Sequence, residues 1–356
     1  MSDIKPRVSI IIPHWNNTDI LSDCLESITL TSYLDLETIV VDNASTDDSV
    51  EWVRSNYPKV KLIENDKNYG YAGGCNIGAE YASGEYLIFL NNDTTQDPNW
   101  VSNLVDTISS NSKIAAVQPK VLNFFDKNLF DYAGGSGGHM DIYCFPIARG
   151  RVFQHQEHDK GQYNDVDKCF WSSGTCFIVK KDLFIQANMF EDSFFAHMEE
   201  IDLCWKLQSM GYEVWVDPNA LVYHKNALTL PMYSHKKYYL NHRNSLLMLF
   251  GNYSLLMLFG NYSMKNAFLI GSTRITLEIV AFLYSILKFD LKHASAIIRS
   301  IVWILFNPHV IIKKRKQFSK IRKIDDDKIM RGMVKKSVVL EYYLKRRKTY
   351  QGILSK

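Results

Sequence analysis

The sequence lacks the short motifs that mark several large enzyme classes. The first strand-like run is followed by His14-Trp-Asn-Asn17 instead of Gly-x-Gly-x-x-Gly, which disfavours a nicotinamide dehydrogenase. No Gly-x-x-x-x-Gly-Lys-Ser/Thr occurs, which argues against a P-loop enzyme. The six cysteines stand far apart and form no Cys-x-x-Cys pair, so the sequence indicates neither a zinc site nor a redox motif. We expect reduced thiols.

Proline and glycine are sparse, at 9 and 18 of 356 residues, while 46% of the residues are apolar and 22% are charged. This composition is typical of a globular protein and excludes a disordered or collagen-like chain. The length predicts two domains, or one large α/β domain with an appendage. Residues 1–262 carry 32 acidic and 20 basic side chains, whereas residues 263–356 carry 6 and 21. The two parts are therefore expected to face different environments.

Strand-like and helix-like segments alternate through the first ninety residues. The strand-like runs are Val8–Pro13, Glu37–Asp42, Val60–Ile63 and Tyr86–Leu90, and the helical segments are about 19–31, 47–56 and 72–82. This alternation predicts an α/β fold with a mostly parallel sheet covered by helices on both faces. Because the N-terminus runs directly into the first strand, we expect no secretory signal peptide.

Each of the four strand-like runs ends in polar residues, in the segments 13–17, 42–46, 64–70 and 91–95. Loops in general are rich in Asp, Asn and Gly because these residues form turns. Ligands of parallel sheets, however, bind beyond the carboxyl ends of the strands. Four polar ends in succession therefore indicate a site for a polar, phosphorylated ligand.

Asp93 is the first candidate metal ligand, since it follows a strand and is flanked by amides and a hydroxyl. Mg²⁺ and Mn²⁺ prefer oxygen ligands and often take one or two carboxylates plus substrate phosphates. A metal that bridges a diphosphate at Asp93 is therefore predicted. The alternative is a cap for the helix that starts near Pro98, a position for which Asp97 is better placed.

Glu199, Glu200 and Asp202 form a second acidic cluster, among Phe, Met and Trp residues. Burial among apolar side chains raises the pKa of a carboxylate and suits it to act as a general base. The helix dipole explains acids in a first helical turn equally well. His224 ends a further apolar run and is either a metal ligand or a histidine with satisfied hydrogen bonds.

Six motifs occur in order along the chain, each weak by itself. They are Val8-Ser-Ile-Ile-Ile-Pro13, Val41-Asp-Asn-Ala-Ser-Thr-Asp-Asp48, Asn68-Tyr-Gly-Tyr-Ala-Gly-Gly-Cys-Asn-Ile-Gly78, Leu90-Asn-Asn-Asp-Thr94, Glu199-Glu-Ile-Asp-Leu203 and Tyr223-His224. Together, over roughly residues 6–244, the set resembles an inverting glycosyltransferase of family 2, in its rhamnosyltransferase-like branch. The resemblance implies a GT-A fold, a nucleoside diphosphate sugar (dTDP- or UDP-linked) as donor, and a divalent cation, Mg²⁺ or Mn²⁺.

The resemblance also assigns roles to individual residues. By it, Asp42 reads the pyrimidine base, Pro13 lines the base pocket, Asn68 and Gly74 cradle the nucleotide or sugar, and Asp93 is the last residue of a D-x-D-like metal motif whose first acid is Asn91 here. The full donor-binding set that we predict is Pro13, Asp42, Asn43, Asn68, Gly74, Asn92, Asp93 and Arg243, with Asp93 and His224 as the metal ligands.

The Glu199-Glu200 pair matches the family's Glu-Asp pair, whose second member is the usual base. That member is Glu200 here, one methylene longer, and which of the two acids acts stays open, with Asp202 as a further candidate. A base deprotonates an acceptor hydroxyl, which attacks the anomeric carbon opposite the departing diphosphate and inverts its configuration. A metal ion, helix N-termini or a cation stabilises the leaving group. Arg243 is the candidate cation because a planar guanidinium suits a diphosphate; a surface arginine is the alternative.

The C-terminal third is apolar but interrupted by charges, so it holds no window of 18 uncharged apolar residues and no spanning helix is expected. Segments 275–287 and 294–306 predict amphipathic helices, and the run 313–323 adds seven basic residues and no acid. Together these signals predict docking on an anionic membrane surface. The alternative is a soluble helical subdomain with a solvated charge run. Nucleic acid is not an expected partner, because the N-terminal part is acidic and holds no reading motif.

These observations predict a GT-A domain at residues 1–240, an amphipathic helical region at 241–312 and a basic tail at 313–356. The predicted function is transfer of rhamnose or another hexose to a hydroxyl of a lipid-linked glycan in cell-surface polysaccharide synthesis. The predicted location is cytoplasmic, peripheral on the inner face of the cell membrane. The segment Ser245–Tyr253 recurs unchanged as residues 254–262, which we interpret as a neutral duplication.

The sequence can be compared with two alternative functions. A nucleotidyltransferase is disfavoured because no Gly-rich, Lys- or Arg-bearing triphosphate loop occurs early in the chain. A catalytically decayed, membrane-docked glycan-binding or scaffold protein is the second alternative. Asn91 and Glu200, the two departures from the family pattern, favour it.

Overall fold

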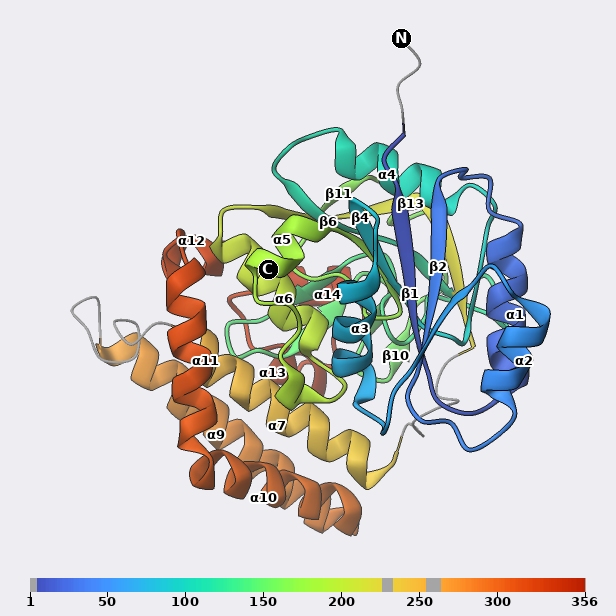
Figure 1. The fold of residues 1–356 in the computed structure, drawn as a ribbon. Helices are drawn as coiled ribbons and strands as arrows, with labels where there is room; N and C mark the ends of the chain where they lie inside the picture. The colour runs from blue at the N-terminus through green and yellow to red at the C-terminus, as the bar shows by residue number, and fades with distance from the viewer. Residues whose placement is uncertain (1–4, 226–232, 254–263, 356) are drawn as a thin grey trace.

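A mixed β-sheet of nine strands forms the centre of the protein (Figure 1). The computed structural model describes residues 5–225, 233–253 and 264–355, and side chains from residue 270 onward in the last range. The strand order is β11-β13-β6-β12-β4-β1-β2-β3, with β5 paired to β13. The strands are β1 (Val8–His14), β2 (Leu36–Asp42), β3 (Lys61–Glu64), β4 (Tyr86–Leu90), β5 (Thr94–Gln96), β6 (Ile114–Asn123), β11 (Asp167–Cys169), β12 (Cys176–Lys180) and β13 (Glu213–His224).

The four predicted strands are confirmed as β1 to β4, which pair in parallel with one another. The expectation of a mostly parallel sheet holds only for this half. In the other half, β12 lies antiparallel between β4 and β6, and β5 and β11 run antiparallel to β13. The reason is that the chain re-enters the sheet at the same end at which β6 leaves it, so β12 runs against β6, and no local pattern reveals this.

Side chains alternate between the two faces of the sheet and form two separate cores. In β1, Ile11 belongs to one core, whereas Ile10 and Ile12 belong to the other. This follows from the two-residue period of a strand. The first core lies under α3 (Gly70–Tyr81), where Gly78 is required because a Cβ would stand 2.4 Å from Ile11 Cγ2. The second core lies under α1 (Thr18–Thr29) and α4 (Trp100–Ser109), and α2 (Ser49–Asn56) flanks β3.

A small antiparallel sheet forms a third packing unit beside the main one. Its strands are β7 (Gly138–Met140), β8 (Pro146–Ala148), β9 (Arg151–Val152) and β10 (His155–Gln156). Ile147 and Val152 of this sheet pack in one cluster with Val338 and Ile353. The latter two belong to α13 (Val338–Tyr343) and α14 (Tyr350–Leu354), so the end of the chain folds back onto the body.

The remaining helices carry the acidic cluster and the C-terminal third. They are α5 (Lys181–Gln186), the 3₁₀ turn η1 (Asp192–Phe194), α6 (Glu199–Ser209), α7 (His235–Asn252), α9 (Met264–Leu287), α10 (Leu291–Phe306), α11 (Pro308–Ile321) and α12 (Asp326–Met330). Figure 1 shows α7, α9, α10 and α11 gathered on the side of the protein away from α1 and α2. The proposed boundary at 240/241 falls inside α7, and Phe318, Ile329 and Met333 of the proposed tail belong to the first core.

The two predicted amphipathic helices lie within α9 and α10. By length and composition alone, one helix among the described residues could cross a membrane, in its segment Ile270–Leu287, although Arg274 and Glu278 interrupt it. The pair α10 and α11, bent by 71°, passes the same test together. α7 ends at Asn252, within the first copy of the repeat; the second copy lies outside the described residues.

Candidate active site

Asp42 ends β2 at the carboxyl edge of the sheet. Only one of its two carboxylate oxygens accepts a hydrogen bond from the described part of the protein. The side chain is 3% exposed, and Oδ2 accepts a hydrogen bond from the Ser45 N–H at 2.9 Å. Oδ1 is buried and has no hydrogen-bond partner among the described residues. A buried acceptor without a partner is costly unless a ligand supplies a donor. Asp42 therefore has the chemistry to accept an N–H of a bound base.

Asn43 and Gly74 hold the neighbouring loop in place. Asn43 Nδ2 donates to the Gly70 carbonyl at 3.2 Å, and its Oδ1 accepts from Asn65 Nδ2 at 3.0 Å. A Cβ on Gly74 would stand 3.0 Å from Asn43 Nδ2 and 3.1 Å from Pro13 Cβ, so a larger residue would displace these neighbours by a few tenths of an ångström. The structure thus brings Pro13, Asn43 and Gly74 together.

Asn68 and Asn92 occupy different environments. Asn68 is exposed at the surface, where its Oδ1 accepts from the Gly70 N–H at 2.8 Å and shapes the turn before α3. Asn92 is buried, with Nδ2 at 2.8 Å from His14 Nδ1. His14, which the sequence analysis did not single out, also has a buried Nε2 without a partner among the described residues, and burial lowers its pKa.

Asp93, His224 and Asp131 form a buried row. His224 Nε2 lies 3.0 Å from Asp93 Oδ1, and His224 Nδ1 lies 2.9 Å from Asp131 Oδ1. The antiparallel pairing of β13 with β5 sets His224 opposite Thr94 and so beside Asp93. Burial lowers the pKa of His224, but the two carboxylates outweigh it and raise that pKa to about 10. Burial likewise raises the pKa of Asp93, and His224 more than offsets this, so the pKa lies below its usual value.

This row fits a divalent cation that displaces the proton of His224 and takes its other ligands from a diphosphate. No group of three or more His, Cys, Asp or Glu side chains that could hold a metal ion occurs among the described residues, so the protein by itself offers only Asp93 and His224. Two ligands plus substrate phosphates suit a hard cation. Asp131 holds the second ring nitrogen of His224, as carboxylates commonly do for metal-binding histidines. α4 begins at Trp100 with Asn99 at its N-cap, so Asp93 does not cap that helix.

Glu199 and Glu200 open α6 and have raised pKa values. Burial raises the pKa of Glu199 well above its usual range, with repulsion from Glu200 adding to it. Burial also raises the pKa of Glu200, to about 7. Oε2 of each is buried without a hydrogen-bond partner among the described residues. A helix dipole alone would lower both pKa values, so the pair fits a general base better than a dipole cap.

Asp202 differs from Glu199 and Glu200 because both of its carboxylate oxygens lie against polar side chains. Its Oδ1 accepts from Lys314 Nζ at 2.6 Å and from Asn252 Nδ2 at 2.8 Å, and its Oδ2 lies 3.3 Å from Lys206 Nζ. Burial raises the pKa of Asp202, but Lys314 and Lys206 bring it below its usual value. A carboxylate held by two ammonium groups is a poor base, so this arrangement favours a structural role.

Arg243 contacts protein carbonyls instead of facing an open site. Its Nη2 donates to the carbonyls of Ser193 at 2.6 Å and Phe194 at 3.0 Å, and its guanidinium lies 5.0 Å from the Trp303 ring. A different cation, Lys237, faces Asp93 and Asp131. Lys237 interacts electrostatically with both carboxylates and with Arg151.

Both of these cations lie over the Tyr132 ring, Arg151 at 4.6 Å and Lys237 at 5.7 Å. Asp131, Lys237 and Arg151 were missed in the sequence because no local motif links them to Asp93.

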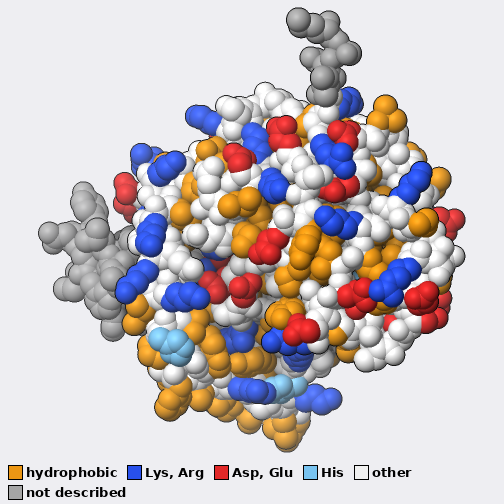
Figure 2. Space-filling model, in the orientation of Figure 1, with side chains coloured by type: hydrophobic (Ala, Val, Ile, Leu, Met, Phe, Trp, Pro, Cys, Tyr) orange, Lys and Arg blue, Asp and Glu red, His pale blue; other side chains and the backbone are white. Residues whose placement is uncertain are grey.

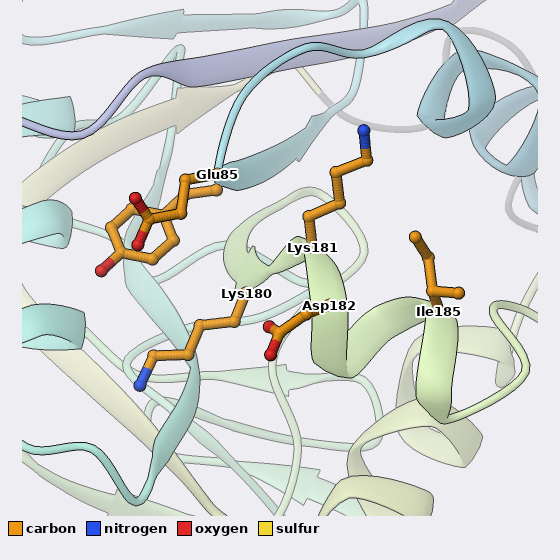
Figure 3. A pocket seen from close by; sticks show the side chains of 6 residues that line it. Glu85, Lys180, Lys181, Asp182 and Ile185 are labelled. Atoms are coloured by element: carbon orange, nitrogen blue, oxygen red, sulfur yellow. The ribbon is translucent and has the colours of Figure 1, made fainter.

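A surface pocket of about 620 Å³ lies elsewhere, at the amino end of β4 (Figure 3). Lys180, Lys181, Asp182 and Ile185 line it with Glu85 and Tyr86. β4 ends at Leu90, on the opposite edge, where the candidate residues gather. None of the predicted site residues lines this pocket.

Residues 9–186, half of the chain, match the family model described as "Glycosyl transferase family 2". The chain belongs to this family. It is 28% identical over 235 residues to the O-antigen biosynthesis protein RfbC of Myxococcus xanthus, a match that covers 62% of this chain and 18% of that protein. It is 25% identical over 249 residues to the N-acetylglucosaminyl-diphospho-decaprenol L-rhamnosyltransferase of Mycobacterium tuberculosis, covering 64% and 78%. The chain spans less than two-fifths of the length of the first curated relatives it matches.

Solved structures confirm the GT-A-like fold of the chain. GalNAc-T7 with UDP, GalNAc and Mn²⁺ superposes with a TM-score of 0.58 at 16% identity, over 71% of this chain and 49% of that one. The mannosyltransferase PcManGT from Pyrobaculum calidifontis, in complex with GDP-Man and Mn²⁺, superposes with a TM-score of 0.51 at 16% identity, over 90% and 86%. The predicted family and fold class are confirmed.

Proposed function

We propose that this protein transfers a hexose, rhamnose being the leading candidate, from a dTDP- or UDP-linked donor to a hydroxyl of a polyprenyl-linked glycan, with inversion at the anomeric carbon. The observation that carries the proposal is the carboxyl edge of the sheet. Asp42 and Asp93 follow strands of the parallel half at this edge, His224 lies beside Asp93, and Glu200 lies beside Gly174, in the turn that is hydrogen-bonded to Asn91. The Mycobacterium relative, whose name describes a rhamnosyltransferase acting on a decaprenyl diphosphate sugar, supports the sugar and acceptor class.

The residues just before β12 connect the turn that carries Asp93 with the surroundings of Glu200. The Asn91 N–H donates to the Thr175 carbonyl at 2.9 Å, which ties the turn before Asp93 to the turn before β12. In that second turn, a Cβ on Gly174 would stand 3.6 Å from the carboxyl carbon of Glu200. Glu200 therefore has backbone instead of a side chain beside it at Gly174, and our proposal places the acceptor hydroxyl on this side.

In this scheme Glu200 takes the proton of the acceptor hydroxyl, because its pKa of about 7 allows it to accept a proton at neutral pH and keep it during transfer. The oxygen then bonds to the anomeric carbon as the bond to the diphosphate breaks on the opposite face. Asp42 orients the base of the donor. Asp93 and His224 would hold a divalent cation, which supplies positive charge to the leaving diphosphate. Lys237 and Arg151 add charge on the same side.

Calorimetric binding of UDP and dTDP, with and without Mn²⁺, tests the donor site on the wild type and on Asp93→Ala. Metal-dependent binding of one nucleotide that is lost in the variant is expected. Absence of binding by either nucleotide under every condition would contradict the proposal. Binding without any sugar transfer or donor hydrolysis would instead favour the scaffold alternative.

We also propose that the protein docks on an anionic membrane through α9 and α10. One side of α9 faces the body of the protein, with Arg274 and Glu278 both 1% exposed. The other side faces solvent, and the exposed apolar side chains there, on α10 and in the turn between the helices include Ile279, Val280, Leu283, Leu287, Phe289, Leu291, Leu305 and Phe306. We call this surface the α9–α10 face. Figure 2 shows apolar and basic side chains side by side along this edge of the protein.

The charges around the α9–α10 face favour a bilayer surface as its partner. Lys288 and Lys292 are exposed at the turn between the helices, and Lys313 and Lys316 are exposed on α11. Soluble monomers rarely expose so many contiguous apolar side chains, and a basic rim is attracted by anionic headgroups. Because only one side of α9 is open, the helix suits a position in the plane of the interface, at the inner face of the cell membrane.

A further inference from the structure

The loop that leads into Glu199 and Glu200 has an unusual backbone. Phe195, His197 and Met198 have φ angles of 65°, 70° and 73°, and none of them is glycine. Such conformations cost about 1–3 kcal/mol each and persist only where the surroundings enforce them. Something outside residues 193–198 therefore holds this loop in shape.

Two adjacent side chains of α7 contact the loop through its carbonyl groups. Asn244, which is fully buried, places Nδ2 at 3.0 Å from the Phe194 carbonyl, 2.9 Å from that of Ala196 and 2.7 Å from that of His197. Arg243 Nη2 donates to the carbonyls of Ser193 and Phe194, and Arg243 Nε donates to Asn244 Oδ1 at 2.8 Å. One pair of residues thus contacts four carbonyl groups of the loop, those of Ser193, Phe194, Ala196 and His197.

The loop connects the two ends of the candidate active site. Its Phe195 carbonyl accepts from the Ala72 N–H at 3.1 Å, in the first turn of α3. A Cβ on Gly70 would stand 2.3 Å from that same carbonyl oxygen, so loop and helix are in close contact beside Asn43. At its other end the loop continues directly into Glu199 and Glu200. Its shape therefore sets the distance between the donor loop and the acids.

We propose that Asn244, supported by Arg243, is a positioning residue that holds loop 193–198 in the strained form that presents Glu199 and Glu200 to the acceptor. This inference rests on the proposed function and adds to it a residue that touches neither donor nor acceptor. The inference also gives Arg243 a different role from the expected one. Its guanidinium donates to carbonyl groups of the loop and is therefore not assigned to the diphosphate.

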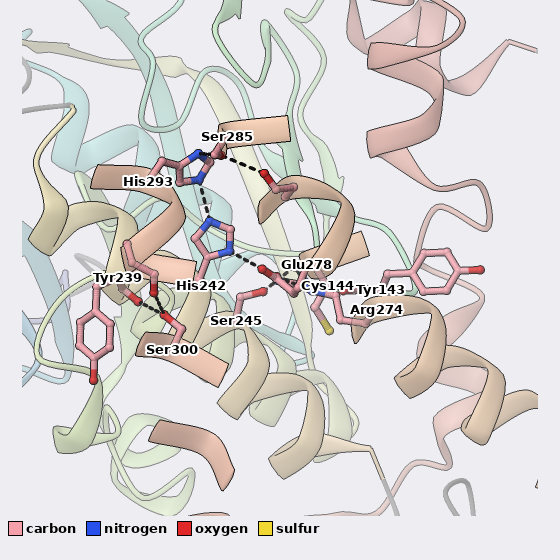
Figure 4. Close-up of polar contacts among 12 residues, drawn as sticks. Tyr143, Cys144, Tyr239, His242, Ser245, Arg274, Glu278, Ser285, His293 and Ser300 are labelled. Atoms are coloured by element: carbon pink, nitrogen blue, oxygen red, sulfur yellow. Dashed lines mark hydrogen bonds and ion pairs between the residues drawn. The ribbon is translucent and has the colours of Figure 1, made fainter. Parts of the chain in front are cut away.

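His242, the residue before Arg243, links α7 to α9 and α10. His242 Nδ1 lies 2.6 Å from Glu278 Oε2 of α9, and His242 Nε2 lies 2.9 Å from His293 Nε2 of α10 (Figure 4). Arg274 donates to Glu278 and to the Tyr143 carbonyl, which extends the network to the body of the protein. The α9–α10 pair thus buttresses the helix that carries the loop contacts.

The test compares the wild type with Asn244→Ala and, as a matched control, Ser245→Ala. Ser245 is the next residue of α7, equally buried, and donates a single hydrogen bond to the Cys144 carbonyl, away from the loop. Amide hydrogen exchange of residues 193–200 is expected to speed up at least about tenfold in Asn244→Ala and to stay unchanged in the control. Unchanged exchange in Asn244→Ala would overturn the inference whatever the activity.

In the transfer assay, Asn244→Ala is expected to lower kcat by about 10- to 100-fold, since a displacement of about 1 Å of a catalytic group has that effect, with nucleotide affinity within about twofold of wild type. The acid limb of its pH–rate profile should also move to lower pH, because water reaching Glu200 reduces the burial that raises the Glu200 pKa. A wild-type kcat and an unshifted profile would overturn the inference. An inactive wild type with faster exchange in the variant would instead contradict the proposed function.

Arg243 provides a second pair of variants if Asn244→Ala does not fold. Arg243→Lys keeps a donor for the Ser193 and Phe194 carbonyls, whereas Arg243→Met does not. The lysine variant is expected to recover most of the kcat that the methionine variant loses. Equal kcat in the two variants would count against the positioning role.

Discussion

At the scale of single residues, Glu200 is expected to dominate the chemistry. Glu200→Gln should lower kcat by about 10²- to 10⁴-fold, the usual range for loss of a general base, while nucleotide binding persists. Because burial raises the pKa of Glu200 to about 7 and the base must be ionised, wild-type kcat should rise with pH and level off above about 7. A pH–rate profile that is flat between pH 5 and 8 would contradict this role, and Glu199→Gln measured in parallel shows which acid acts.

Protonation of Glu199 is expected to affect the stability of the fold instead of the rate of transfer. Its pKa is raised well above the usual value of 4.5, so the folded protein holds the proton more tightly than the unfolded chain does. Stability is therefore lost as pH rises above about 4.5, by up to about 1.4 kcal/mol per pH unit. Glu199→Gln should raise Tm more at pH 8 than at pH 5. Glu51→Gln on the exposed surface of α2 is the control, and an equal change at both pH values would refute the prediction.

Asp131 is expected to act on metal affinity through His224. It holds His224 Nδ1 at 2.9 Å, and loss of such a partner commonly weakens metal binding by about 10- to 100-fold. Asp131→Asn should therefore weaken Mn²⁺ binding in the presence of the nucleotide, as followed by the electron paramagnetic resonance of free Mn²⁺. Asp159→Asn serves as a control because Asp159 pairs with Lys120 instead. Unchanged Mn²⁺ affinity would contradict the supporting role of Asp131.

At the scale of elements, the buried pair Asp202–Lys314 joins α6 to α11. Lys314 is 2% exposed, and removing it leaves the buried Asp202 with Lys206 as its nearby cation and Asn252 as its hydrogen-bond donor. Loss of one partner of a buried pair costs about 3–5 kcal/mol. Lys314→Met should lower the free energy of unfolding by about 3 kcal/mol in urea denaturation, the low end because Lys206 remains. Lys313→Met, one residue away and exposed, should have almost no effect; equal effects in the two variants would exclude the pair as a structural link.

The same contact corrects the interpretation of the basic run 313–323. Lys314 pairs with Asp202, Arg315 donates to the Phe250 and Tyr253 carbonyls, and Arg322 bonds to Asp326. Three of the seven basic side chains therefore face the body of the protein. The other four basic side chains are exposed and available to contact a membrane surface. They are Lys313, Lys316, Lys320 and Lys323.

At the scale of the whole molecule, the α9–α10 face should determine membrane binding. Leu287 and Phe289 are 77% and 88% exposed, and burying each in a bilayer interface contributes about 1.5–3 kcal/mol. The double variant Leu287→Asp, Phe289→Asp should bind vesicles containing anionic lipid at least about tenfold more weakly than wild type in co-sedimentation. Leu34→Asp, at a residue 99% exposed beside β2, is the control. No binding of the wild type to anionic vesicles would refute membrane docking.

The sequence by itself determined the α/β class, the first four strands, the family and the polar strand ends, because these depend on local periodicity and on motifs within a few residues. It did not reveal that half of the sheet is mixed, that Asp131 stands behind His224, or that Asp202 is paired with Lys314. Asp131 and His224 lie 93 positions apart in the sequence, and Asp202 and Lys314 lie 112 positions apart. Their contacts exist only after the chain has folded. The tertiary structure alone decided which acids remain without a partner, and hence which can act as a base, because desolvation and pairing are properties of the packed protein and not of a sequence window.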